Sequence, residues 1–244
     1  MKNRILALFL TVFLIISANC YAEKVIFTTF RIPLMVIDNK KGVFIELTHE
    51  IGKRAGVDYR IIVVSPKGAI HKFMAKKADI LFPALDVNFP KGIKHIKSSE
   101  LIYVKADYVF TKKGKRVLRT MGDLEGKRIG ITLGYPYVFE LISNNLIKID
   151  VASSDVLNVR KLNAERFDAF VVEEKSGIKA FEQAGLKNQM QYDKRVPLSR
   201  QDVFYAFQSN KKGKMLSERI SKALASMKKD GTFAKIMKKA SSKK

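Results

Sequence analysis

The sequence predicts an α/β protein of two lobes, each with a mixed, mostly parallel sheet flanked by helices. Two observations predict this class. Apolar, β-branched runs alternate with segments of helical periodicity from residue 24 to residue 85, and strand–helix–strand order favours a parallel sheet with right-handed crossovers. The same alternation restarts near residue 126. The chain therefore contains two such units, joined by extended segments.

The first unit is predicted from periodicity and from its helix termini. Phe44, Leu47 and Ile51 fall on one helical face, and Pro66 suits the first turn of a helix. The run at 78–85 is apolar on both faces, as in a parallel strand covered by helices. The expected strands are 24–30, 58–65 and 78–85, and the expected helices are 43–56 and 66–77.

The second unit repeats this pattern, and extended segments near 105–112 and 198–206 connect the two lobes as a double-stranded hinge. We expect lobe 1 to comprise residues 23–108 and 203–244, and lobe 2 to comprise 109–202. The expected strands are 126–134, 167–174 and 202–210; the expected helices are 135–145, 153–166, 174–185 and two C-terminal helices broken at Asp230–Gly231.

The N-terminus has the features of an export signal. Lys2 and Arg4 precede the 12 residues ILALFLTVFLII, which are too few to span a bilayer. Small residues follow, so residues 1–22 are predicted to be a signal peptide cut after Ala22. A lipoprotein signal at Cys20 is the alternative, although SAN is a poor lipidation box. The mature protein is then expected in the periplasm.

The composition restricts the chemistry. Cys20 is the only cysteine, so cleavage leaves no disulfide and no thiol catalyst. The three histidines are scattered without metal-ligand spacing, and neither a metal site nor a cofactor is expected. The net charge of +23 becomes +21 without residues 1–22. It favours anionic partners, and the alternative is a solvated basic shell. No aromatic–basic motif indicates nucleic acid.

The candidate site follows from the topology. Ligands of open α/β sheets bind beyond the carboxyl ends of the strands. If the two lobes face each other, the loops at these ends line one cleft. The loops are Phe30–Pro33, Asp86–Gly92, Gly134–Tyr137 and Glu173–Gly177.

Five segments, in the right order, resemble the bacterial extracellular solute-binding proteins of family 3, the receptors of polar amino-acid ABC transporters. DLEGKRIGITLG (123–134) is very close to one family signature, and LSERISKALASMKKDGTFAKIMKK (216–239) is the most specific piece. The resemblance implies the type II periplasmic-binding-protein fold, a monomer, and an inner-membrane ABC permease as partner. The other segments are GVFIEL (42–47), MAKKADILFPAL (74–85) and KLNAERFDAFVVEE (161–174).

In lobe 1, the resemblance implies ligand contacts at four positions whose residues differ from the family pattern. Arg31 stands where the family has a stacking aromatic ring, and Asp86 where it has a hydroxyl. Asn88 replaces a Thr, and Lys91 replaces the Arg that holds the ligand carboxylate. A Lys is a point charge and lacks the planar fork of Arg. Each residue could instead be solvated or serve the turn, and Asp86 could pair with Arg31 or Lys91.

In lobe 2, Tyr135 and Pro136 replace two Thr residues that grip the ligand carboxylate in the family. Tyr135 and Tyr137 could supply the missing aromatic ring, although one of them could pack into the core. Glu173 stands where the family acid pairs with the ligand ammonium, while Glu174 is expected to cap the next helix.

The expected function is a solute receptor, not an enzyme, whose ligand is small, polar, possibly anionic, and either not a standard α-amino acid or held atypically. One alternative is a sensory or interaction protein on the same fold, signalling to a membrane partner. A second is an enzyme resembling cyclohexadienyl dehydratases, with Glu173 as the general acid.

Overall fold

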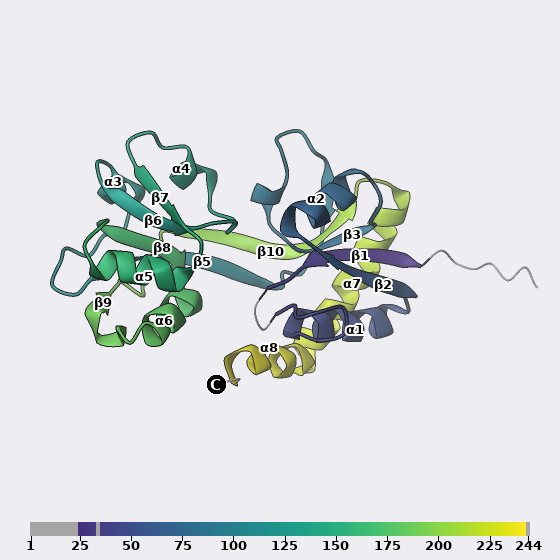
Figure 1. Ribbon diagram of the computed structural model, residues 1–244. Coiled ribbons are helices and arrows are strands. Elements are labelled where there is room, and N and C mark those ends of the chain that lie inside the picture. The colour runs from purple at the N-terminus through teal and green to yellow at the C-terminus, as the bar shows by residue number, and fades with distance from the viewer. Residues whose placement is uncertain (1–23, 33–34, 243–244) are drawn as a thin grey trace, which may run out of the picture.

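The computed structural model describes residues 24–32 and 35–242. The predicted signal peptide, with Cys20, lies outside the described residues, as does Pro33 in the first candidate loop. Figure 1 shows two bodies linked by the long strands β5 (Tyr103–Lys112) and β10 (Ser199–Gln208), which run through the middle of the molecule.

Lobe 1 is built on a parallel core of three strands. β1 pairs in parallel with β2 on one side and β3 on the other, and β10 is added antiparallel to β3. The elements are β1 (Val25–Phe30), α1 (Val43–Ala55), β2 (Tyr59–Val64), α2 (Pro66–Met74), β3 (Ile80–Ala84), a 3₁₀ turn η1 (Asp86–Asn88) and β4 (His95–Lys97), which pairs with β10.

Lobe 2 has the same arrangement. β6 pairs in parallel with β7 and β8, and β5 is antiparallel to β8. The elements are α3 (Met121–Leu124), β6 (Arg128–Thr132), α4 (Phe139–Ile142), β7 (Lys148–Ala152), α5 (Asp155–Asn163), β8 (Ala169–Glu173), α6 (Glu174–Gln183), η2 (Lys187–Gln189) and β9 (Met190–Gln191).

The two lobes share one curled sheet of order β2-β1-β3-β10-β5-β8-β6-β7. β5 and β10 pair antiparallel from Tyr103–Val203 to Asp107–Ser199. The fold class is therefore as predicted: a mixed, mostly parallel α/β structure with two connecting strands.

The C-terminal helices return to lobe 1. α7 (Lys211–Lys229) packs against α1 and β10, and α8 (Thr232–Ser242) packs against α1 and α7. Arg54 of α1 fixes this corner, because its guanidinium contacts Asp230 at 2.5 Å and Thr232 at 3.1 Å. Figure 1 shows α8 below α1, with the C-terminal end close by.

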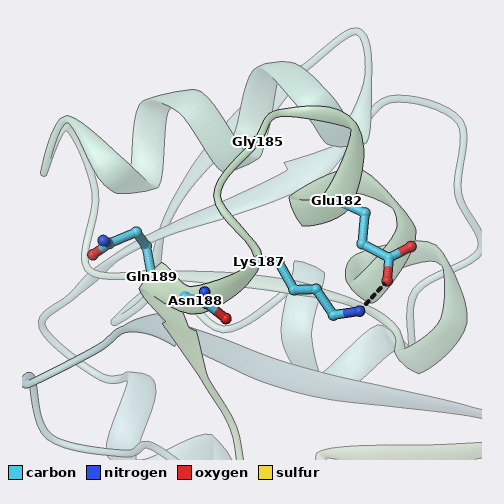
Figure 2. Close-up of a pocket in the computed structure, with 5 residues that line it drawn as sticks. All are labelled: Glu182, Gly185, Lys187, Asn188 and Gln189. Atoms are coloured by element: carbon cyan, nitrogen blue, oxygen red, sulfur yellow. Dashed lines mark hydrogen bonds and ion pairs between the residues drawn. The ribbon is translucent and has the colours of Figure 1, made fainter.

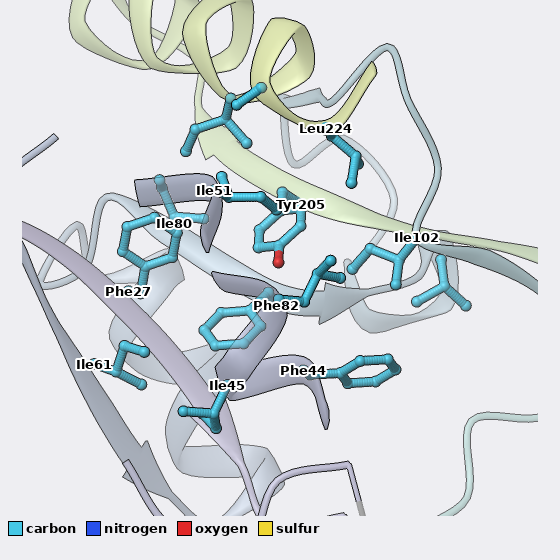
Figure 3. Packing of buried hydrophobic residues seen from close by; sticks show 14 of the residues in the cluster. Phe27, Phe44, Ile45, Ile51, Ile61, Ile80, Phe82, Ile102, Tyr205 and Leu224 are labelled. Carbon is cyan, nitrogen blue, oxygen red and sulfur yellow. The ribbon is translucent and has the colours of Figure 1, made fainter. Parts of the chain in front are cut away.

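The lobe 1 core is aromatic and aliphatic. Figure 3 shows Phe27, Phe82 and Tyr205 gathered between β1, β3 and β10, with α1 and α7 around them. The Tyr205 hydroxyl is fully buried and lies 2.9 Å from Thr48 Oγ1, so its polar group is satisfied inside the core. Lobe 2 has separate clusters on the two faces of its sheet, around Leu124 and around Phe170.

One predicted helix is much shorter than expected. The pattern over 135–145 predicts a full helix with Pro136 in its first turn, but α4 covers only Phe139–Ile142. The reason is Tyr137, which is 4% exposed and turns its side chain into the lobe. Its hydroxyl accepts from the Thr132 N–H and donates to the Val171 carbonyl. This anchor holds 134–138 as a loop.

Candidate functional site

The two lobes present equivalent loops. In each lobe, the central strand and the strand beside it end in loops at the same sheet edge, because the strands are parallel. Lobe 1 contributes the segments after β1 and β3, and lobe 2 those after β6 and β8. The lobes approach each other here, since Lys91 Nζ lies 5.9 Å from the centroid of the Phe139 ring.

Glu173 is the acid of lobe 2 that the resemblance places at the ligand. It ends β8, and its Oε2 accepts from the Ser176 N–H at 3.0 Å, which caps α6. The cap was expected at Glu174, which instead accepts from the Tyr192 hydroxyl. The cap uses Oε2, and no hydrogen bond to Oε1 is found within the described residues.

Two tyrosines lie near Glu173. Tyr103 starts β5 and Tyr135 follows β6, and both are partly exposed. Burial, followed by the neighbouring Glu173 and Asp107 carboxylates, raises the pKa of Tyr103. Burial, followed by Asp155 and Glu173, raises the pKa of Tyr135. Both hydroxyls therefore keep their protons at physiological pH.

The Tyr135 hydroxyl is held by α5. It donates to Asp155 Oδ2 at 2.8 Å, and the Thr132 hydroxyl donates to Asp155 Oδ1 at 2.5 Å. Asn158 in turn donates to Thr132 Oγ1 at 3.0 Å. Asp155 therefore fixes the ring that the resemblance places at the ligand. Tyr137, the other candidate ring, belongs to the core of lobe 2.

A buried polar cluster, which we call the hinge network, connects this loop to both connecting strands. Lys105 and Asp107 of β5 form an ion pair with side chains 8% and 2% exposed. Lys105 also donates to the Pro136 carbonyl at 3.3 Å, and Gln201 of β10 donates to the same oxygen at 2.8 Å. The Ser199 hydroxyl donates to Asp107 at 3.2 Å.

The hinge network was not predicted from the sequence. A signal was available, because Lys105 and Asp107 interrupt the apolar run LIYVKADYVF at a spacing of two. That spacing puts both side chains on one face of a strand. The pattern could not reveal the other members of the network, because they are distant in the sequence. Lys105 and Pro136 are 31 residues apart, and Gln201 and Pro136 are 65 residues apart.

The lobe 1 candidates are placed differently. Arg31 directly follows β1, is exposed, and has no polar partner among the described residues. Asp86 pairs with Lys97 at 2.6 Å and lies 3.7 Å from His95, so its partners are in its own lobe and are neither Arg31 nor Lys91. Lys91 is exposed.

Asn88 serves the turn itself. Its Oδ1 accepts from the Leu85 N–H at 2.8 Å, which closes the 3₁₀ turn after β3. Among the lobe 1 candidates, Arg31 is thus exposed to solvent and Lys91 lies near Phe139 of lobe 2. Asp86 and Asn88 instead contact residues of their own lobe.

Two surface hollows lie away from these residues. One, of about 470 Å³, lies in lobe 2 after α6. Figure 2 shows its lining, where Lys187 pairs with Glu182 near Gly185, Asn188 and Gln189. Another of about 410 Å³ lies on lobe 1 beside the first turns of α1, lined in part by Lys41, Glu46 and Lys239. Neither contains a predicted site residue.

Two further features are absent from the part of the chain that the structure describes. Within 24–32 and 35–242, no cluster of His, Cys, Asp or Glu side chains has the arrangement of a metal site. No helix in those ranges has both the length and the apolar character to cross a bilayer.

The profile of the bacterial extracellular solute-binding proteins, family 3, matches residues 24–243. This chain belongs to that family. A putative amino-acid ABC transporter-binding protein, PatH of Vibrio harveyi, is 24% identical over 202 residues, covering 82% of this chain and 79% of the relative.

Solved structures show the same fold. A mutant of ArgBP from T. maritima is similar with a TM-score of 0.67 and 20% identity, covering 91% of this chain and 97% of that one. A histidine kinase sensor domain with similarity to periplasmic binding proteins has a TM-score of 0.68 and 18% identity, covering 89% and 95%. The type II fold is thereby established, and the relatives are binding proteins.

Proposed function

We propose that this protein is a periplasmic receptor that closes its two lobes on a small polar ligand and delivers it to an ABC-type permease. Family membership supports the receptor class. The proposal includes export by a signal peptide cut after Ala22 and the lobe boundaries predicted from the sequence. Motion about β5 and β10, the two connecting strands, would carry lobe 2 towards lobe 1.

The observation that carries this proposal is that Glu173, with one carboxylate oxygen not used by the α6 cap, ends β8 beside β6, the strand that Tyr135 follows. A carboxylate and a tyrosine ring at the ends of adjacent strands suit the cationic end of a ligand. On the opposite lobe, Arg31 and Lys91 offer positive charge for an anionic end. The ligand is therefore proposed to carry both charges, with its cation on lobe 2.

The ligand is proposed not to be a standard α-amino acid, or to be held atypically. Pro136 has no N–H to offer an anion, and its carbonyl is already bound by Lys105 and Gln201. Lys91 cannot form the bidentate contact of an Arg. The ligand's anionic end would thus be held by Arg31 and Lys91 of lobe 1, and not by an Arg at the position of Lys91 together with N–H groups at Pro136.

A thermal-shift screen tests this function. Amino acids, dicarboxylates, phosphorylated compounds and oligosaccharides are added separately, and a ligand present at 100 times its Kd should stabilise the folded protein by about 2.7 kcal/mol. Glu173→Gln keeps the oxygen that caps α6 but removes the charge, so it should abolish the shift with little change in basal Tm. Glu182→Gln, also in lobe 2, is the matched control.

If every compound leaves the Tm unchanged, or if Glu173→Gln responds like Glu182→Gln, the proposal is wrong. A second candidate, a sensory receptor that signals to a membrane partner, is favoured by the likeness to a histidine kinase sensor domain. A ligand that stabilises the protein while a membrane kinase, and no permease, is recovered with the closed form would support that candidate.

A further inference from the structure

Positive charge is concentrated on lobe 1. Residues 24–102 and 203–242 contain 24 Lys and Arg against 9 Asp and Glu, whereas residues 103–202 contain 18 against 13. The net charges of these parts are +15 and +5, respectively. An anionic surface would therefore attract the molecule with lobe 1 foremost.

The clearest basic feature of lobe 1 is one face of α7. Four exposed lysines lie along it, and we call them the lysine stripe: Lys211, Lys214, Lys222 and Lys229. At 3.6 residues per turn, their spacing places them within about 80° of arc over about 27 Å of helix. The opposite face is buried against lobe 1 and includes Leu216, Ile220, Leu224 and Met227.

The lysine stripe is not neutralised by acidic residues of the protein. Two other lysines of α7 are neutralised in this way, because Lys212 pairs with Asp79 and Lys228 with Glu100, both at 2.7 Å. None of the stripe lysines has an ion pair or hydrogen bond to any residue that the structure describes. Glu218 is exposed on the same face and is the single acid there, so the face keeps a net positive charge.

The chemistry of this face distinguishes between anionic partners. α7 contains no aromatic residue to stack on bases. Its single Arg, Arg219, is bound to the Ala55 and Gly56 carbonyls at the end of α1. What remains is a row of flexible point charges with Met215, 48% exposed, among them. Such a row suits the diffuse negative charge of lipid headgroups better than a partner that needs fixed bidentate contacts.

We propose that the lysine stripe binds the surface of an anionic phospholipid bilayer and orients lobe 1 against the membrane. The stripe belongs to α7 alone, and none of its residues lies in the loops at the strand ends. Bilayer binding would therefore leave Arg31, Glu173 and the connecting strands free. Bilayer binding through the lysine stripe does not depend on which ligand the protein takes.

Vesicle binding tests the proposal. The chain from residue 23 onward, which contains all the described elements and omits the apolar run at 5–16, is mixed with phosphatidylcholine vesicles with and without phosphatidylglycerol at 0.1 M salt. Each lysine near such a surface strengthens binding roughly fivefold. Changing all four stripe lysines to Gln should therefore weaken binding to anionic vesicles at least about tenfold.

The matched control changes four exposed lysines of lobe 2 to Gln: Lys113, Lys148, Lys179 and Lys194. It removes the same charge and should weaken binding less than about twofold, because those lysines would face away from the bilayer. Changing the four stripe lysines to Arg should preserve binding. Glu218→Gln should strengthen it a fewfold, which simple loss of folding could not do.

Three results would overturn the proposal. The wild-type chain could bind neutral and anionic vesicles equally, or the lobe 2 control could lose as much affinity as the stripe variant. Glu218→Gln could leave vesicle binding unchanged. Circular dichroism of each variant, expected to match the wild type because every substituted side chain is exposed, verifies folding.

Discussion

The two lobes have the same strand order but different surroundings. From its outer edge inward, lobe 1 runs β2-β1-β3-β10 and lobe 2 runs β7-β6-β8-β5, and in each the last strand is antiparallel. The helix after the central strand differs most. α1 has 13 residues with seven buried, whereas α4 has four with only Leu141 buried.

This difference separates the position of the loops, which depends on the sheet, from the side chains that each loop exposes, which do not. Parallel pairing puts the loops of both lobes at corresponding edges, so it fixes where a site can form. Local residues decide what each loop presents. Tyr137 draws the lobe 2 loop inward, and apolar side chains such as Leu133, Phe139 and Ile142 remain exposed around it.

The largest contrast is expected between the first crossover helices. Phe44 of α1 is 1% exposed and Phe139 of α4 is 63% exposed. Phe44→Ala should lower the free energy of unfolding by about 3–5 kcal/mol, because it leaves a cavity. Phe139→Ala should change it by less than about 0.5 kcal/mol. Urea unfolding measures both, and equal effects would contradict the difference in packing.

Substitutions in the hinge network should have the next largest effect on the free energy of unfolding. They test whether the connecting strands need the Lys105–Asp107 ion pair. Lys105→Met leaves the buried Asp107 carboxylate without its cation and should cost about 3–5 kcal/mol. Asp107→Leu should cost about as much. The double variant should recover most of this loss, since an apolar pair replaces the ion pair.

A double-mutant cycle in urea measures the coupling between Lys105 and Asp107. Additive costs would show that the two side chains stabilise the protein independently, against the geometry of their contact.

The smallest effect concerns pH, and it should arise in lobe 1, where all three histidines lie. His95 stacks on Phe89 with ring centroids 3.9 Å apart, and burial lowers its pKa below the usual 6.5. Asp86 opposes this shift and Lys97 adds to it. The unfolded chain therefore binds a proton first, so folding stability should fall as pH drops below about 6.5.

His95→Phe keeps the stacking and should flatten this part of the stability profile between pH 7 and 5.5. His71→Gln, which removes an exposed histidine of the same lobe, is the control. Urea midpoints at each pH supply the measurement. An unchanged slope in His95→Phe would show that another group causes the dependence.

The sequence predicted the elements better than the contacts. Strands β1, β2, β3, β6, β8 and β10 lie where apolar runs were found, and α7 and α8 break at Asp230–Gly231 as expected. β4, β7 and β9 were not predicted. β4 and β9 are three and two residues long and depend on their partner strands β10 and β5. In β7 only Ala152 is buried, and its sequence KIDVA lacks the apolar run that reveals a buried strand.

The site was predictable only as a set of positions. Strand order and family resemblance led to Glu173 and Tyr135 at the loops of lobe 2, and their roles remain predictions. The resemblance could not show that Asp155 holds Tyr135, or that Asn88 closes its own turn. The sequence also gave no sign that Glu173 lies opposite Asp107, because the two residues are 66 positions apart and meet through the pairing of β5 with β8.

The sequence by itself determined the order of strands and helices, the two-lobe class and the family, because periodicity and short motifs act within single segments. Only the tertiary structure decided that Tyr137 turns inward, that Asp86 pairs with Lys97, and that Lys105 and Asp107 are buried together. It also decided which lysines of α7 are neutralised and which are left exposed. These outcomes depend on contacts between distant residues, and such contacts exist only once the sheet and its helices have packed.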